Sequence, residues 1–162
     1  MSIPGYMAIT GEDQGAIKGS SYKQGQEDKI EVLSFDHLIE LPARQETQMT
    51  TGDPVHRPVM LRKEVDASTP KLYQALCRQE LLESLEIQWF RHTPEGREEL
   101  FYTVVLTNAL IVAIQPWSAD YLDERLEHYR PMEKVSFAYE AIRWSWGVDG
   151  DVEYEAVWDV NR

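Results

Sequence analysis

The stretch from Val59 to Leu76 contains the only strong helix signal of the sequence, directly after a strand signal. Val59, Leu61 and Val65 alternate with polar residues, which is the period of a half-buried strand. Thr69 then suits the N-cap and Pro70 the first helical position, where the missing N–H of proline costs nothing. Three apolar residues follow at helical spacing and predict a face that docks on a core: Leu72, Ala75 and Leu76. Because the rest of the chain alternates like strands, this stretch restricts the fold to a mainly β domain with one helix.

The remaining sequence is typical of strands joined by turns. Strands are predicted over 5–10, 30–41, 85–91, 98–107, 109–114, 133–146 and 152–160, with a polar connection over 115–132. The apolar pattern changes phase within 30–41 and again near Glu140 and Ala141, which indicates a bulge or a strand that curves between sheets. Asp149 and Gly150 form the strongest hairpin signal. Many strands, two phase changes and one helix predict an antiparallel β-barrel-like domain with one flanking α-helix.

The charge balance and the lack of long apolar runs exclude several classes of function. The 162 residues carry a formal net charge of −12, whereas phosphate binding needs clustered Lys and Arg, so no nucleic acid is expected as a partner. The same charge argues against binding to a membrane surface, and no apolar run approaches the length of a membrane span. The N-terminus lacks the basic start and apolar core of a signal peptide, which predicts a cytoplasmic origin. Cys77 is the single cysteine, and we interpret it as a small hydrophobic residue.

The sequence contains no pattern that predicts catalysis, a cofactor or a metal. The four histidines are scattered without metal-ligand spacing, so surface or hydrogen-bonded roles are favoured: His37, His56, His92 and His128. Lys63 shares a strand face with apolar residues, and a salt bridge to Asp66 or a neighbouring acid explains it, with its alkyl stem on the core. A nucleophile elbow, a phosphate loop and a zinc pattern are all missing. We therefore expect no enzyme activity and no cofactor.

Aromatic residues gather near the C-terminus: Trp144, Trp146, Tyr154 and Trp158. Exposed aromatic rings on a β-face can stack on sugars, which keeps a carbohydrate-binding barrel as an alternative. These side chains alternate as core residues do, however, and we favour a core interpretation.

Two segments are candidates for contact with another subunit. The segment 42–58 is long and polar, and its composition alone favours a plain surface loop over an arm that reaches a neighbour. The segment 109–114 is almost wholly apolar, so it is buried on both faces or packs one face on a partner subunit.

Several motifs resemble one known family at matching spacing. The helix stretch contributes His56, Pro58, Lys63, Asp66, Ser68, Pro70 and Leu72. The segments 17–20, 30–37, 86–91 and 102–112 add Ile-Lys-Gly-Ser, Ile-Glu-Val-Leu-Ser-Phe-Asp-His, Glu-Ile-Gln-Trp-Phe-Arg and Tyr-Thr-Val-Val-Leu-Thr-Asn-Ala-Leu-Ile-Val. Near the end, Tyr139, Ile142 and Trp144 match a Tyr-x-x-Ile-x-Trp pattern. Together they resemble the haemolysin-coregulated protein (Hcp) family, the inner-tube protein of the bacterial type VI secretion system, from Gly5 to Trp158.

The resemblance implies a structural role rather than an enzyme. Hcp proteins form hexameric rings that stack into a hollow, exported tube, meet sheath and spike proteins, and shelter effectors in the lumen. In this family the extended loop at 42–58 takes part in assembly, and the chain is exported without a signal peptide. We accordingly predict that the subunit interface includes Met49, Val55, His56, Leu110 and Val112. Residues 1–162 are expected to form a single tube domain without the C-terminal toxin extension that some members carry.

Two alternatives remain open at this point. A phage-type tail tube protein is the same class of assembly in another setting, and gene neighbourhood separates the two. A monomeric carbohydrate-binding β-barrel belongs to another class, and it predicts tryptophan fluorescence changes with glycans and no ring.

Overall fold

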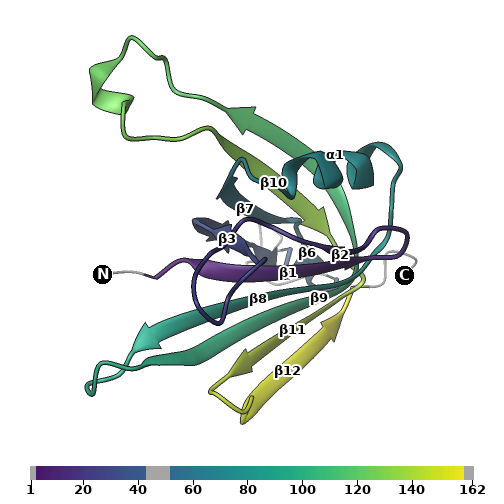
Figure 1. The fold of residues 1–162 in the computed structure, drawn as a ribbon. Coiled ribbons are helices and arrows are strands. Elements are labelled where there is room, and N and C mark those ends of the chain that lie inside the picture. The colour runs from purple at the N-terminus through teal and green to yellow at the C-terminus, as the bar shows by residue number, and fades with distance from the viewer. Residues whose placement is uncertain (1–2, 43–51, 159–162) are drawn as a thin grey trace.

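The computed structural model describes residues 3–42 and 52–158. The regular elements of these residues are strands, one α-helix and one short 3₁₀ helix. The strands are β1 (Gly5–Gly11), β2 (Gly15–Ile17), β3 (Ile30–Val32), β4 (Ser34–Asp36), β5 (Ile39–Glu40), β6 (Val55–His56), β7 (Val59–Glu64), β8 (Leu82–His92), β9 (Glu98–Trp117), β10 (Met132–Ala138), β11 (Ala141–Trp146) and β12 (Val152–Val157). The helices are α1 (Thr69–Cys77) and η1 (Glu124–Leu126). The prediction of a mainly β domain with one flanking α-helix is confirmed (Figure 1).

Ten of the strands form one antiparallel sheet that curves back on itself. Its path runs β2-β1-β8-β9-β10-β7-β4, with β11 and β12 added beside β9. β3 pairs with β1, and β4, one residue further along the chain, pairs with β7. β3 and β4 therefore link strands near opposite ends of the path by almost continuous chain, which makes the domain barrel-like. This change of partner also confirms that the segment 30–41 curves between sheet regions, while its last part, β5, forms a separate two-stranded sheet with β6.

β9 is the longest strand, and it links two regions of the barrel. It pairs with β11 up to Thr107 and with β8 up to Ala109, and from Leu110 onward it pairs with β10. Asn108, at the changeover, has a φ of 50°, a left-handed conformation that asparagine adopts more readily than most residues. Figure 1 shows the β8–β9 and β9–β10 hairpins leaving the barrel in different directions. The strand ends at Trp117, so the polar connection predicted to begin at residue 115 starts later.

β10 and β11 replace the single strand predicted over 133–146. The break falls at Tyr139 and Glu140, where the chain leaves the second half of β9 and joins the first half. The Glu140 N–H donates to the Thr107 carbonyl at 3.1 Å, and the Glu140 carbonyl accepts from the Trp158 N–H at 2.7 Å. The phase change in the sequence therefore reflects a change of partner segment and not a bulge within one strand.

α1 packs Leu72 and Ala75 onto the core, as its apolar spacing predicts. The N-cap is Ser68 and not Thr69, which is the first helical residue. That prediction was wrong by one position because the Thr69 hydroxyl is engaged with other partners, which are described below. Val65 follows β7 and is exposed, so the predicted strand extended one residue too far. Within the described part of the chain, no helix has the length and apolar character needed to cross a membrane.

Candidate assembly surfaces

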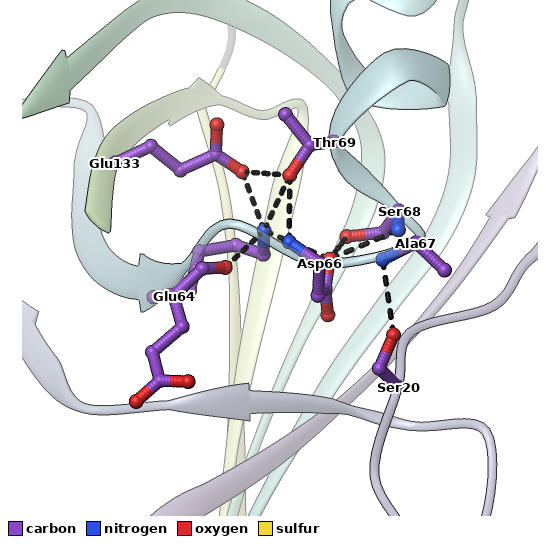
Figure 2. A network of polar contacts seen from close by, with 8 residues as sticks. Ser20, Glu64, Asp66, Ala67, Ser68, Thr69 and Glu133 are labelled. Carbon is purple, nitrogen blue, oxygen red and sulfur yellow. Dashed lines mark hydrogen bonds and ion pairs between the residues drawn. The ribbon is translucent and has the colours of Figure 1, made fainter. Parts of the chain in front are cut away.

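A buried ionic cluster fixes α1 to the barrel between β7 and β10 (Figure 2). The Nζ atom of Lys63 contacts Oε1 of Glu133 and lies 3.1 Å from Oδ1 of Asp66. It also donates to the Glu64 carbonyl oxygen at 2.9 Å and to the Thr69 hydroxyl at 3.3 Å. Thr69 in turn donates to Glu133 at 2.8 Å, which ties the first helical residue to β10. The predicted salt bridge between Lys63 and Asp66 is confirmed.

The cluster holds one cation against two carboxylates in a largely buried site. The side chain of Lys63 is 0% exposed and that of Glu133 is 1% exposed. Oε2 of Glu133 is buried and has no hydrogen-bond partner in the part of the chain that the structure describes. The remaining groups are bonded to one another, so we assign the cluster to the attachment of the helix. The two surfaces described next lie on this barrel.

The first surface lies on the hairpin of β11 and β12. Here the side of the sheet that faces the core continues beyond the end of the core. Trp144 is opposite Val104, a fully buried core residue, and Tyr154 is opposite Trp144 on β12. Because side chains alternate along a strand, Trp146 and its partner Val152 face the same side. Trp146, Val152 and Tyr154 are nevertheless 50%, 67% and 69% exposed. We call Trp144, Trp146, Val152 and Tyr154 the aromatic surface.

The core interpretation of the C-terminal aromatic residues is thus right for two of them and wrong for two. Trp144 and Trp158 are partly buried and pack against the core. Trp146 and Tyr154 lie on the core-facing side but beyond the end of the core, on the hairpin at the bottom of Figure 1. The Trp144 and Tyr154 rings are stacked at 6.3 Å with an interplanar angle of 10°, which stiffens the hairpin.

The second surface lies on the outer side of β9 and β10. Leu110 and Val112 are 38% and 49% exposed, whereas Ala109 and Ile111, which alternate with them along the strand, face the core. Further along the same outer side lie Gln115 and Trp117, opposite Lys134 and Met132 of β10. Arg62 of β7 is opposite Lys134 on its other side. We call Leu110, Val112, Trp117, Lys134 and Arg62 the β9–β10 surface.

The far end of this second surface is hollowed. A groove of about 390 Å³ is lined by residues that include Arg62, Trp117, Tyr129, Met132 and Lys134. The Trp117 and Tyr129 rings in this lining meet edge to face, with centroids 5.7 Å apart and 82° between the planes. Within residues 3–42 and 52–158, neither Arg62 nor Lys134 forms an ion pair. The surface is therefore apolar at one end and cationic at the other, on a chain whose net charge is −12.

A third cluster lies at the base of the segment 42–58, where β5 and β6 meet the barrel. Tyr139 Oη lies 2.9 Å from Nε2 of His37 and 2.6 Å from Nδ1 of His56. The His56 ring also packs on the Trp158 ring at 5.1 Å, with 32° between the planes. Burial, and next the neighbouring His56, lower the pKa of His37, and burial lowers the pKa of His56. Burial likewise raises the pKa of the Tyr139 hydroxyl.

The structure places the predicted interface residues in two groups. Leu110 and Val112 lie together on the outer side of β9, with part of each side chain open to solvent. Val55 and His56 form β6 and are half-buried. Met49 lies outside the described residues. The assignment of these five residues to a subunit interface stays a prediction.

Sequence reasoning missed the contribution of two regions. The exposed positions of β12 look like core positions because the strand alternates, although it pairs on one side only, with β11. Trp117 and Tyr129 lie within the segment 115–132, which was interpreted as a polar connection. A direct contact between two of the four histidines and one tyrosine was not predicted either. Across the described ranges, no group of three or more His, Cys, Asp or Glu residues has an arrangement that could hold a metal ion.

Comparison with known proteins gives a consistent result across family, sequence and structure. The family model described as "Type VI secretion system effector, Hcp" matches residues 6–146. The "Major exported protein" of Pseudomonas aeruginosa is 36% identical over 159 residues, which cover 93% of this chain and 92% of that protein. A structure of Hcp1 from the E. coli EAEC 042 pathovar has a TM-score of 0.87 at 30% identity, covering 98% of this chain and all of that one. The secreted protein Hcp3 of Pseudomonas aeruginosa has a TM-score of 0.78 at 33% identity, covering 96% and 98%.

These matches define the class of protein as a component of the bacterial type VI secretion system. The family model spans most of the sequence, and a relative 36% identical is covered almost end to end. The chain belongs to the Hcp family.

Proposed function

We propose that this protein is a structural subunit of the type VI inner tube. Identical copies form a hexameric ring, and rings stack into a hollow tube that is exported with the effectors in its lumen. The observation that carries the proposal is the presence of two unlike, unpartnered surfaces, the aromatic surface and the β9–β10 surface. Membership of the Hcp family and the similarity to exported and secreted relatives support it.

Two unlike surfaces are what a ring of identical subunits requires. In a head-to-tail contact one patch of each copy meets a different patch of the next, and the ring closes when the rotation between copies allows it. We propose that the aromatic surface of one copy packs on the β9–β10 surface of its neighbour. Trp146 and Tyr154 are the residue types that dominate binding energy in protein interfaces. A stable contact buries at least about 1,000 Å².

The partners of the tube follow from the same assignment. Sheath and spike proteins of the type VI apparatus would contact the outside and the end of the tube, and effectors would occupy its lumen. A non-catalytic role accords with the family. Export of the tube does not depend on a signal peptide in this proposal, because the apparatus itself propels it.

The exposure of Trp146 and Tyr154 favours a second candidate, a monomeric carbohydrate-binding barrel. Aromatic rings open to solvent on a sheet can stack on sugar rings. This candidate predicts a monomer whose tryptophan fluorescence changes on addition of glycans. A phage-type tail tube gives the same ring as the main proposal, and the genomic neighbourhood separates it.

The native mass, measured by light scattering with negative-stain imaging of the same fraction, tests the proposal. We expect a hexamer of about six times 18.8 kDa. Trp146→Glu and Leu110→Glu should each give monomers, because each removes one of the two patches. Tyr22→Glu, at a position 94% exposed and outside both surfaces, is the matched control and should keep the ring.

Mixing the two variants sharpens the test. Each retains the patch that the other lacks, so an equimolar mixture should form a dimer of about twice 18.8 kDa and grow no further. A monomeric parent protein would overturn the ring. A hexameric parent with monomers in the mixture would overturn the pairing of these two surfaces while leaving the ring intact.

A further inference from the structure

Two imidazole rings share a single hydroxyl group at the point where β5 and β6 join the barrel. Both distances to Tyr139 Oη are hydrogen-bonding distances, 2.9 Å from His37 and 2.6 Å from His56. Within the described part of the chain, β5 and β6 pair only with each other, and these bonds join the small sheet to the barrel through side chains. We propose that His37, Tyr139 and His56 form an acid-sensitive latch, which holds the β5–β6 sheet on the barrel at neutral pH and releases it on acidification.

The number of protons in the cluster explains why it would open. A tyrosine hydroxyl has one proton to donate and accepts through its oxygen. With both imidazoles neutral, the hydroxyl donates to one ring nitrogen and accepts from the other. Protonation of one ring keeps this pattern, because the charged ring donates and the neutral ring accepts. Protonation of both rings makes both facing nitrogens donors, leaves the hydroxyl proton without an acceptor there, and sets two cations against one oxygen atom.

The surroundings of His37 and His56 offer no counter-charge for a second proton. The charged groups nearest in the chain are Asp36, which is exposed, Arg57, which is paired with Glu40 at 3.0 Å, and Glu140, which accepts from the Asn108 amide at 2.8 Å. The ring contacts of the imidazoles are with Phe35, Tyr139 and Trp158. No carboxylate lies within salt-bridge distance of either imidazole in the described part of the chain. A hydrogen bond to the Arg57 backbone favours a proton on His37, but its effect is smaller than that of burial, which lowers the pKa of this ring.

The direction of the pH effect follows from linkage. Burial lowers the pKa of both imidazoles in the attached state, so the open state binds protons more tightly. The attached state is therefore favoured at neutral pH, and it is lost as the pH falls below about 6.5, the ordinary histidine value. Each proton taken up on opening changes the equilibrium constant by about tenfold per pH unit in this range. For two protons with an ordinary pKa of about 6.5 in the open state, the opening constant rises by about thirtyfold between pH 6.5 and 5.5, and by about one hundredfold between pH 7.5 and 5.5.

A consequence for assembly rests on the proposed function. Val55 and His56 belong to the predicted subunit interface, and release of β6 would change the surface that a neighbouring subunit meets. The latch would then allow acidification to loosen a tube. The latch itself needs no second subunit, so it can be measured in the ring and in the single chain.

Hydrogen–deuterium exchange of the whole protein at pH 7.5 and 5.5, corrected for intrinsic rates, tests the latch. The reporting amides are those of the β5–β6 sheet and of Arg57, whose N–H donates to the Leu38 carbonyl at 3.0 Å. We expect their corrected exchange to speed up by about tenfold to one hundredfold at pH 5.5. Amides of β1 and β8, which pair along their length, are the internal reference and should not change.

Two variants separate the latch from a general effect of acid. His37→Gln with His56→Gln keeps polar groups that do not titrate, so the acceleration should disappear. His92→Gln, at an exposed position, should behave like the parent protein. An equal acceleration in the double variant, no acceleration in the parent, or an equal change in β1 and β8 would overturn the latch. The same measurement on monomeric Trp146→Glu distinguishes the two proposals, because a failed ring leaves the exchange result unaffected.

Discussion

Replacing Lys63 by methionine tests the ionic cluster that holds α1. Methionine keeps an unbranched stem and removes the charge, so Glu133 and Asp66 remain without the ammonium group that bridges them. Asp66 retains bonds from the N–H and hydroxyl of Ser68, and its side chain is 13% exposed. Glu133 is fully enclosed and keeps only the bond from Thr69. Breaking a buried ion pair by removing one partner costs about 3–5 kcal/mol, and we expect Lys63→Met to lose that amount.

Chemical denaturation at fixed protein concentration measures this loss in the free energy of unfolding. For a domain of this size each kcal/mol lowers the melting temperature by about 2–4 °C, so the variant should melt about 6–20 °C below the parent. Lys18→Met is the matched control. Lys18 pairs with Asp28 at 3.6 Å, and both side chains are about two-thirds exposed, at 65% and 64%. Exposed pairs contribute about 0–1 kcal/mol, so the control should be nearly silent.

Two results would refute the reasoning about the cluster. One is a loss in Lys63→Met no larger than that of the control, which would mean that desolvation cancels the attraction within the cluster. The other is the absence of any rescue when Glu133→Gln is added to Lys63→Met, since the neutral amide removes the stranded charge.

Three further substitutions test separate parts of the structure by urea and thermal unfolding. Gly11→Ala places a Cβ against the Glu80 carboxylate, which accepts hydrogen bonds from two N–H groups of the turn after β1. The substitution should lower the free energy of unfolding by about 1–3 kcal/mol. An unchanged stability would show that the turn adjusts to the extra atom without cost. Tyr139→Phe should lose about 1–2 kcal/mol at pH 7.5. The parent is expected to lose stability below pH 6.5, because burial lowers the pKa of its two histidines and the unfolded chain therefore binds protons more tightly. Tyr139→Phe should lose less stability over the same pH range, and an equal loss would contradict this. Asn108→Val forces a β-branched residue to a φ of 50° and should cost about 1–3 kcal/mol, whereas Asn108→Gly should stay within about 1 kcal/mol; equal losses would point to the side-chain bond instead.

The local elements and the buried lysine were predictable because their causes are local. Thr69 and Pro70 lie within the first turn of α1, and Leu72 and Ala75 form its buried side. Lys63 could be paired with Asp66 because the two are three residues apart and Lys63 lies on an apolar strand face. Its second partner, Glu133, is 70 residues away, and nothing in the pattern selects it from the other acids of the chain.

The candidate site was less predictable because it depends on where the barrel ends. Trp146 and Tyr154 alternate as core residues do, and their exposure follows from a hairpin that continues past the last core row at Val104 and Trp144. Contacts across long sequence separations were also out of reach. His37 is 102 residues from Tyr139, and no periodicity relates them. The membership of the Hcp family was predicted from the resemblance of several motifs, and not from the apolar pattern.

β9 connects the two candidate surfaces and thereby constrains how a ring can close. Its first half supports β11, which carries Trp146, and its second half carries Leu110. The change of partner falls at Asn108, whose backbone is left-handed. A head-to-tail ring closes only if the two patches of one subunit stand at a fixed angle, and here one strand carries or supports both. Glu140 is one of the two residues between β10 and β11, and it accepts a hydrogen bond from the Asn108 amide. This bond fixes the chain at the point where β9 changes partner. The geometry that separates the two surfaces is therefore set inside one subunit, before any neighbour is met.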